Sequence, residues 1–149
     1  MGNKFSANIL LCEEITDDKR FEGIFNNLIL EEDEIVIFNI AIFLTKNIVE
    51  VKDEMFLLDL AYERENGTNY HPIGTTTRMC NELGKSIEIA AFKSVEVEFA
   101  WEGLYRLEFR KCKNHVDINT LNDEELLKFI KNSDLVQSFT FSVEKNVRE

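Results

Sequence analysis

Apolar and polar residues alternate along most of the chain, which is typical of half-buried β-strands. The clearest case runs from Leu104 to Cys112, where Tyr105, Leu107 and Phe109 alternate with charged residues. Similar patterns bounded by turn residues predict further strands over residues 7–15, 21–30, 69–78, 86–99 and 135–145. The segment 86–99 is expected to form a half-buried strand or a bent pair, with one charged break at Lys93.

Two further segments are apolar at both odd and even positions. Residues 35–45 form the most apolar stretch, and their β-branched and aromatic content favours a strand that is covered on both sides. Residues 54–65 fit either a strand or a helix. The dipeptide Asn66-Gly67 is a strong hairpin signal, so it favours the strand and would place Tyr62 opposite His71. The returning strand contains Pro72, which cannot donate a ladder hydrogen bond and is therefore expected at a sheet edge.

One helix is predicted before the last strand. Asn122 can cap its first turn, and Glu125, three residues later, completes a capping-box pattern. The apolar side chains of Leu126, Phe129 and Ile130 would form its buried side, and the polar residues 132–134 end it.

Seven or eight strands, one late helix and no alternation of strands with helices predict an all-β fold. We expect a two-sheet antiparallel β-sandwich, immunoglobulin-like or C2-like, formed by residues 1–149 as a single domain. The 12 phenylalanines supply bulky side chains for the space between the sheets.

Two groups of residues carry a resemblance to known proteins. The first is 10–13 with 21–25, and the second is Phe99, Gly103, Tyr105 and Phe109 with 139–143. They resemble the opening hairpin and the closing strand pair of an uncharacterised bacterial and phage family of small β-sandwich proteins, a domain of unknown function. Trp101-Glu102 departs from the family, where a proline is expected before the glycine, and the Asn122 helix enlarges the final connection. The resemblance implies a β-sandwich of bacterial or phage origin and supplies no catalytic residue.

Composition excludes several classes of function. The 149 residues include 28 acidic and 17 basic side chains, giving a formal net charge of −11 at pH 7, and 44% are hydrophobic. This charge argues against binding nucleic acid or an anionic membrane, because phosphates would repel it. No apolar run is long enough for a membrane helix. Three widely spaced cysteines and the lack of a secretory signal predict the cytoplasm.

Cys112 and His115 form the only Cys–His pair with close, ligand-like spacing, and a zinc site would also need His71 and Cys80. Lysines flank Cys112, which is the local charge that a reactive thiolate requires. A buried thiol and an exposed histidine explain the same residues without any chemistry. Serine-hydrolase, phosphate-loop and dinucleotide motifs are absent. We therefore predict no catalytic residue, no metal ligand and no cofactor, and we expect the chain not to be an enzyme.

Four acidic clusters fall in expected loops, where carboxylates can bind calcium. They are Asp17-Asp18, 31–34, Asp53-Glu54 and 123–125. None has the alternating ligand spacing of a calcium loop, and solvated surface or helix capping explains them as well. A calcium-binding sandwich domain is kept as an alternative.

The candidate partner-binding residues are Thr75, Thr76, Thr77 and Arg78 on the expected edge strand, together with the aromatic Trp101. An ordinary protected edge explains the same strand without a partner. We expect a non-catalytic interaction or structural module that binds a protein partner or a second copy of itself. The alternative is an acidic phage-type inhibitor that occupies a basic site on a host nucleic-acid-handling or defence protein.

Overall fold

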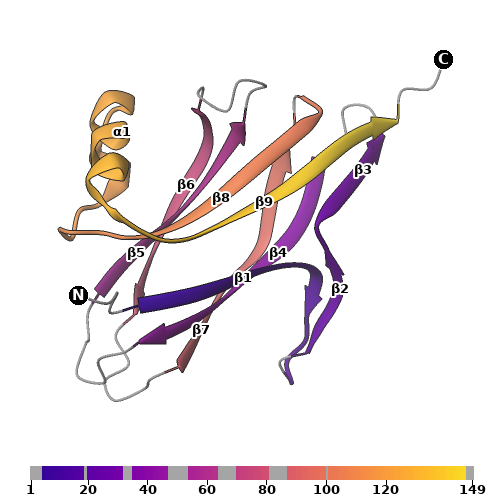
Figure 1. Cartoon of the computed structure of the whole chain (residues 1–149), viewed down its shortest axis with the longest axis horizontal. Helices are drawn as coiled ribbons and strands as arrows, with labels where there is room; N and C mark the ends of the chain where they lie inside the picture. Colours follow the sequence, from indigo (N-terminus) through magenta and orange to yellow (C-terminus); the bar gives the residue numbers. More distant parts are fainter. Residues whose placement is uncertain are drawn as a thin grey trace.

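The computed structural model describes residues 5–18, 20–31, 35–46, 54–63, 70–80, 87–99 and 101–146. The strands found in these ranges are β1 (Phe5–Ile15), β2 (Phe21–Phe25), β3 (Asn27–Glu31), β4 (Ile35–Lys46), β5 (Glu54–Glu63), β6 (Tyr70–Cys80), β7 (Ile87–Glu98), β8 (Gly103–Lys111) and β9 (Asp134–Asn146). A short 3₁₀ helix (Ile118–Thr120) and α1 (Asp123–Asn132) lie between β8 and β9 (Figure 1). The predicted all-β fold with one helix before the last strand is confirmed.

The strands form two sheets. The four-stranded sheet has the order β2-β1-β4-β7, and the five-stranded sheet has the order β3-β9-β8-β5-β6. All pairs are antiparallel except β3 with β9, which is parallel. In Figure 1, β9 and β1 run close together where the two sheets meet, and the Gln137 side chain there donates a hydrogen bond to the Ala7 carbonyl oxygen, 3.0 Å away.

The prediction of one strand over residues 21–30 is wrong. The chain leaves the four-stranded sheet after Phe25, bends at Asn26 and enters the five-stranded sheet at Asn27. The backbone N–H of Ser142 donates to the Asn26 carbonyl oxygen, which fixes this corner against β9. A strand that changes sheets turns its side chains through a corner, so a continuous apolar pattern in the sequence conceals the break.

One hydrophobic core contains side chains of both sheets. Phe38 of the four-stranded sheet stacks on Phe99, whose ring lies edge-on to Tyr105 of the five-stranded sheet. Phe5 of β1 and Phe56 of β5 make another edge-on contact, with ring centroids 5.2 Å apart. The phenylalanines therefore occupy the space between the sheets, as expected.

β5 is a strand and not a helix, and both of its sides are buried. Its inner side chains belong to the shared core, while Met55 and Leu57 pack under α1 with Ile130. The β5–β6 register places Tyr62 opposite His71, as predicted. The predicted turn residues Asn66-Gly67 lie outside the described residues. β6 lies at the edge of its sheet among the described strands, which is the position expected for Pro72.

Of the two possibilities for residues 86–99, a half-buried strand or a bent pair, the structure shows one strand, β7, which contains a bulge. The β4–β7 register shifts between Phe38 and Ile40, and Ser94 opposite this point has a φ of 56°. Before the bulge Phe92 contacts the core, and after it Val95 does, so the core-facing positions change from even to odd numbers. Such a bulge inserts one residue and turns the following side chains to the other face.

α1 begins and ends as predicted. The Asn122 side chain accepts a hydrogen bond from the backbone N–H of Glu125, and the Glu125 carboxylate accepts one from the backbone N–H of Asn122. Ser133 follows the last turn as the C-cap residue. Within the described ranges no helix has the length and apolar character needed to cross a membrane.

Candidate functional site

The predicted binding strand lies at the edge of the five-stranded sheet. Residues 75–78 belong to β6, which pairs with β5 and with no second strand among the described residues. Thr75 lies opposite Asp59, and Thr77 lies opposite Leu57. The backbone of this segment is therefore at a sheet edge, and its role in binding stays a prediction.

Trp101, the other predicted binding residue, is 44% exposed and lies over Tyr62, with ring centroids 5.2 Å apart. The Tyr105 hydroxyl donates to the Trp101 carbonyl oxygen at 2.6 Å, and the Tyr62 hydroxyl donates to the Glu102 carbonyl oxygen at 3.0 Å. Two tyrosines thus hold the turn that presents Trp101. Because Tyr62 lies opposite His71, this turn is near the start of β6, and the structure does not bring Trp101 to residues 75–78.

Three exposed isoleucines lie on the outer side of the four-stranded sheet. Ile24 is 62% exposed, Ile35 is 60% exposed and Ile37 is 59% exposed. On β4 the isoleucines alternate with Val36 and Phe38, which contact the core, so Ile35 and Ile37 point away from it. Ile24, Ile35 and Ile37 are called the isoleucine face below.

Strand register places Ile24 on the same side as the two β4 isoleucines. Ile24 is opposite Cys12, and Cys12 is opposite Asn39, two positions along β4 from Ile37. Directly opposed residues of antiparallel strands project to the same side of a sheet. The outer side of β4 is buried further along, at Ala41, so the prediction of a strand covered on both sides holds there and is wrong at the start of β4.

Acidic side chains border the isoleucine face. Glu96 of β7 lies opposite Ile37, and Glu98 lies opposite Ile35. On the other flank, Glu22 precedes Ile24 by two residues on β2. All three carboxylates are exposed, and in the described part of the chain no lysine or arginine forms an ion pair with them. Glu14 of β1 is also exposed, lies opposite Glu22 and projects to the same side of the sheet. Ile35 and Ile37 therefore form a small apolar patch with negative charge on both flanks, and Ile24 lies two strands away on β2.

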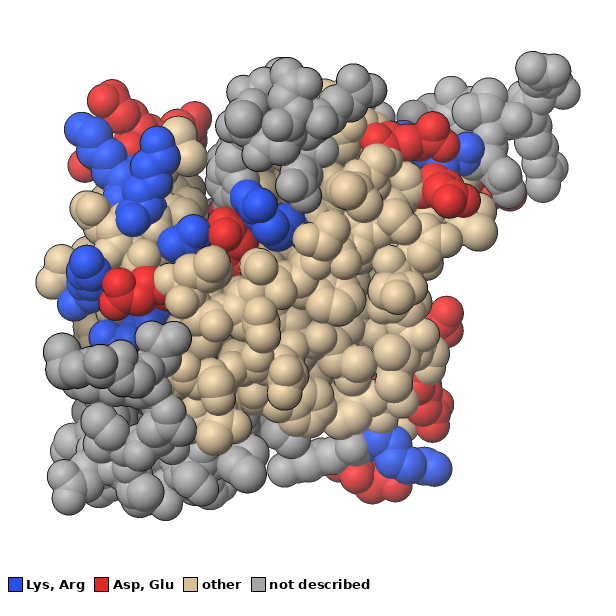
Figure 2. Space-filling view, viewed as in Figure 1, with Lys and Arg blue, Asp and Glu red and all other residues tan. Residues whose placement is uncertain are grey.

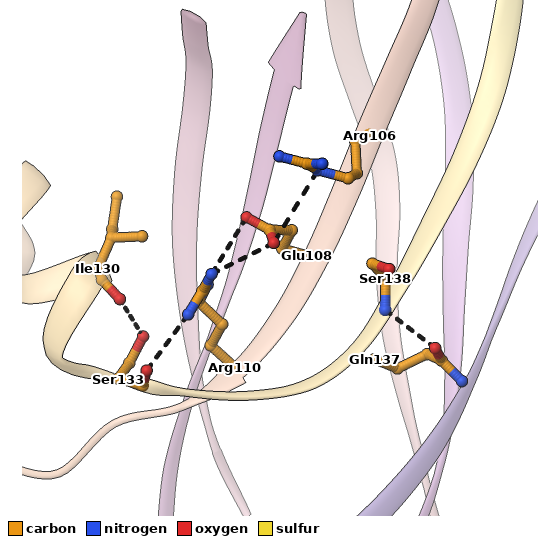
Figure 3. A network of polar contacts seen from close by, with 7 residues as sticks. All are labelled: Arg106, Glu108, Arg110, Ile130, Ser133, Gln137 and Ser138. Atoms are coloured by element: carbon orange, nitrogen blue, oxygen red, sulfur yellow. Dashed lines mark hydrogen bonds and ion pairs between the residues drawn. The ribbon is translucent and has the colours of Figure 1, made fainter. Parts of the chain in front are cut away.

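A second cluster lies on the outer side of the five-stranded sheet. Asp59 and Glu108 are buried and directly opposite each other on β5 and β8. Glu108 accepts hydrogen bonds from Arg110 at 3.2 and 3.3 Å, and the Arg106 Nε atom lies 3.9 Å from its carboxylate (Figure 3). Arg110 also donates to the Ser133 carbonyl oxygen at 3.2 Å, at the C-terminal end of α1 (Figure 3).

This arrangement attaches α1 to the sheet. Like charges directly opposite each other destabilise a strand pair, and the two arginines offset that repulsion. The positive charge of Arg110 also faces the negative end of the helix dipole. Figure 2 shows charged side chains gathered around α1, whereas a broad area of the same view is uncharged. The ion pair of Glu108 with Arg110 and the contact of Arg110 with the end of α1 account for these two residues.

Cys112 is buried beneath α1 and does not have the properties of a nucleophile. Burial raises the pKa of its thiol to about 11, although the nearby Lys111 acts to lower it. His115 is exposed in the segment that follows. Cys12 is buried as well, and burial raises the pKa of its thiol. The two thiols are protonated at neutral pH and are not activated.

Those acidic residues that the structure describes are not assembled into a metal site. Asp18 forms an ion pair with Arg20 at 3.0 Å, and hydrogen bonds from Thr16 and Arg20 lower the pKa of its carboxyl group. Glu125 caps α1, while 32–34 and Asp53 lie outside the described residues. Across the described ranges, no three His, Cys, Asp or Glu side chains come together as metal ligands would.

Sequence reasoning missed the isoleucine face, although a signal for it was present. A strand that is apolar at both odd and even positions needs a cover on each side of its sheet. The sequence predicts only one helix that could provide such a cover. The Asp59–Glu108 pair also had a signal, because Asp59 interrupts an otherwise apolar run. Pairing them required the strand register, which the sequence pattern did not specify.

The chain matches none of the protein-family models compared with it, and a search of curated proteins finds no relative. The site must therefore be interpreted from its own residues.

Proposed function

We propose that this chain is a non-catalytic interaction module that binds a protein partner through the isoleucine face. The observation that carries the proposal is the exposure of Ile35 and Ile37, each about three-fifths exposed on a strand whose other side lies in the core. Large apolar side chains exposed together on a folded protein are typical of an interaction site. Their burial by a partner would contribute about 25 cal/mol for each Å² removed from water.

The charges support a basic partner rather than a second copy. A two-fold dimer through this face would bring the acidic flanks of one chain close to the acidic flanks of the other. A partner with lysine or arginine around an apolar centre would instead meet complementary charge. A basic site on a nucleic-acid-handling or defence protein is the specific partner favoured by the net charge of −11, which is the inhibitor alternative.

The finer description of the fold is also part of this proposal. We infer a β-sandwich, supported by the core that both sheets share and by the hydrogen bond from Tyr105 to the Trp101 carbonyl oxygen. A tyrosine hydroxyl bonded to backbone a few residues upstream is a known feature of immunoglobulin-like sandwiches. We further propose the cytoplasm of a bacterial cell or phage host as its location, in keeping with the free thiols of Cys12 and Cys112.

Affinity capture with matched variants tests the binding face. The immobilised wild-type protein, an Ile35→Thr/Ile37→Thr variant and an Ile29→Thr control are exposed to an extract of the source cell. Ile29 is equally exposed, at 60%, but lies on β3 of the other sheet. Threonine keeps the β-branched shape while removing apolar surface.

We expect a partner that the wild type and Ile29→Thr retain, that Ile35→Thr/Ile37→Thr loses, and that dissociates as salt rises. The purified partner must repeat this ranking in a direct binding measurement. If no protein distinguishes Ile35→Thr/Ile37→Thr from the wild type, the proposal is wrong. A dimer of the chain alone that Ile35→Thr/Ile37→Thr dissociates would likewise contradict it.

A further inference from the structure

Two strands of this fold carry apolar residues on both sides, and the structure treats them differently. The outer side of β5, at Met55 and Leu57, is covered by the chain's own helix α1. The outer side of β4, at Ile35 and Ile37, is not covered by any described element. On β5, the element that covers the outer apolar side is a helix.

The contact between α1 and β5 provides the pattern. Leu126, Phe129 and Ile130 are spaced by three and four residues, so they share one side of α1 and pack on the two β5 side chains. The exposed side of α1 carries charged residues, including the ion pair of Glu124 with Lys128. α1 is therefore an amphipathic helix lying on the outer side of a sheet.

Backbone hydrogen bonding favours the same solution on β4. A single extended segment laid across the isoleucine face would bury backbone N–H and C=O groups without ladder partners. A helix satisfies these groups internally. Four strands about 4.8 Å apart give a sheet about 14 Å wide between its outer strands, enough for one helix about 10–12 Å across.

The charges on the two flanks define the helix further. Glu96 and Glu98 line the β7 side of the face, and Glu14 and Glu22, opposite each other on β1 and β2, lie on the other side. A helix with lysine or arginine on both sides of its apolar stripe would place positive charge next to these carboxylates. β7 also carries one cation near this acidic border, the exposed Lys93.

We propose that the isoleucine face receives an amphipathic helix of the partner protein, with basic residues flanking its apolar stripe. This inference rests on the proposed function and specifies the element that binds. The helix lies across β4 as α1 lies across β5, with its apolar stripe on Ile35 and Ile37.

Two synthetic leucine–lysine peptides of identical composition test the inference. One has leucine at helical spacing (i, i+3, i+4, i+7), and the other alternates leucine with lysine and favours an extended conformation. Binding to the purified chain is measured by fluorescence anisotropy, and helix formation by circular dichroism. The variants are Ile35→Thr/Ile37→Thr and Glu96→Lys, with Ile29→Thr and Glu144→Lys as controls. Glu144 lies opposite Ile29, so the control pair reproduces an exposed isoleucine beside a glutamate at another site.

We expect the helical peptide to bind the wild type and to gain helicity when bound. Its affinity should fall about tenfold or more in Ile35→Thr/Ile37→Thr and in Glu96→Lys, and less than about twofold in the two controls. The alternating peptide should bind more weakly, and its affinity should not depend on Ile35 and Ile37.

Three results would overturn the inference. In the first, the alternating peptide binds this face as tightly as the helical peptide or more tightly. In the second, the variants leave the affinity of the helical peptide unchanged. In the third, neither peptide binds. In each case the capture experiment with Ile35→Thr/Ile37→Thr still decides the proposed function separately, because it does not depend on the structure of the bound segment.

Discussion

The side-chain oxygen of Asn39 in β4 accepts a hydrogen bond from the backbone N–H of Ser94 in β7, 2.9 Å away. The amide nitrogen of the same side chain donates to the Glu13 carbonyl oxygen at 2.8 Å, where β1 ceases to pair with β4. Asn39 thus satisfies the backbone at the bulge and at the end of the β1–β4 ladder. The bulge turns Glu96 outward beside Ile37, so this hydrogen bond helps to define the acidic border of the isoleucine face.

Asn39→Ala should lower the free energy of unfolding by about 1–3 kcal/mol, because two backbone groups lose their partners. Urea unfolding followed by Trp101 fluorescence measures the change. An unchanged unfolding midpoint would show that neither hydrogen bond contributes.

Ser94→Gly should raise the free energy of unfolding by about 1 kcal/mol. Ser94 has a φ of 56°, a conformation that glycine adopts without the steric penalty of a Cβ atom. Ser94→Val should destabilise the protein, because a β-branched side chain is disfavoured there. Equal unfolding midpoints for the two variants would contradict a strained backbone at this position.

Arg110→Met should reduce the free energy of unfolding by about 3 kcal/mol, because it leaves the buried Glu108 carboxylate without its closest cation. The variant also loses the hydrogen bond to the Ser133 carbonyl oxygen at the end of α1. The double variant Arg110→Met/Glu108→Met should be more stable than the single one, because the buried Glu108 carboxylate that has lost its closest cation is then absent. A double variant less stable than Arg110→Met would contradict this account of the cluster.

Cys112 should resist thiol reagents in the folded protein. The labelling experiment uses a Cys80→Ser background, which leaves the two thiols of Cys12 and Cys112. With the Cys112 pKa raised from 9.0 to about 11, its thiolate fraction at pH 8 is about a hundredfold lower than in the unfolded chain. Labelling followed by peptide mass spectrometry should therefore be slow in buffer and fast in urea.

The raised pKa of Cys112 also determines how the free energy of unfolding changes with pH. The folded state holds the Cys112 proton more tightly than the unfolded state, so this contribution is complete below about pH 9 and is lost as the pH approaches about 11. Cys112→Ala should reduce the loss of stability in this interval. Rapid labelling of Cys112 at pH 8 in the folded protein would contradict its buried, protonated state.

Trp101→Ala should leave partner binding unchanged, although Trp101 is exposed and aromatic. Its turn is held by Tyr62 and Tyr105 on the five-stranded sheet, whereas the isoleucine face lies on the other sheet. The capture assay described above measures this directly. Loss of the partner in Trp101→Ala, with retention in Ile35→Thr/Ile37→Thr, would transfer the binding site to Trp101.

Elements that are specified by residues close together in the sequence were predicted correctly. The capping pair Asn122–Glu125 specified where α1 begins. The predicted register of Tyr62 against His71 is the one that β5 and β6 adopt. The residues that cap α1 are close neighbours in the sequence. The alternation over residues 104–112 predicted β8 for the same reason.

Features that depend on distant contacts were not predictable in this way. The strand change at Asn26 depends on β9, and the bulge at Ser94 depends on Asn39, 55 residues earlier. The candidate site also depends on a contact between distant residues, because the pairing of β7 with β4 places Glu96 beside Ile37. The apolar stretch 35–45 indicated that a cover was needed, and only the structure identifies the side that lacks one.

Photo-crosslinking from position 37 tests the central claim most directly. A photoreactive phenylalanine analogue replaces Ile37 in one variant and Ile29 in another, and each is irradiated in the source cell. We predict one dominant crosslinked protein from position 37, absent from position 29, with the crosslink mapping to a basic amphipathic segment of that protein. The same crosslinked products from both positions, or none from position 37, would contradict the assignment of the isoleucine face as the binding surface.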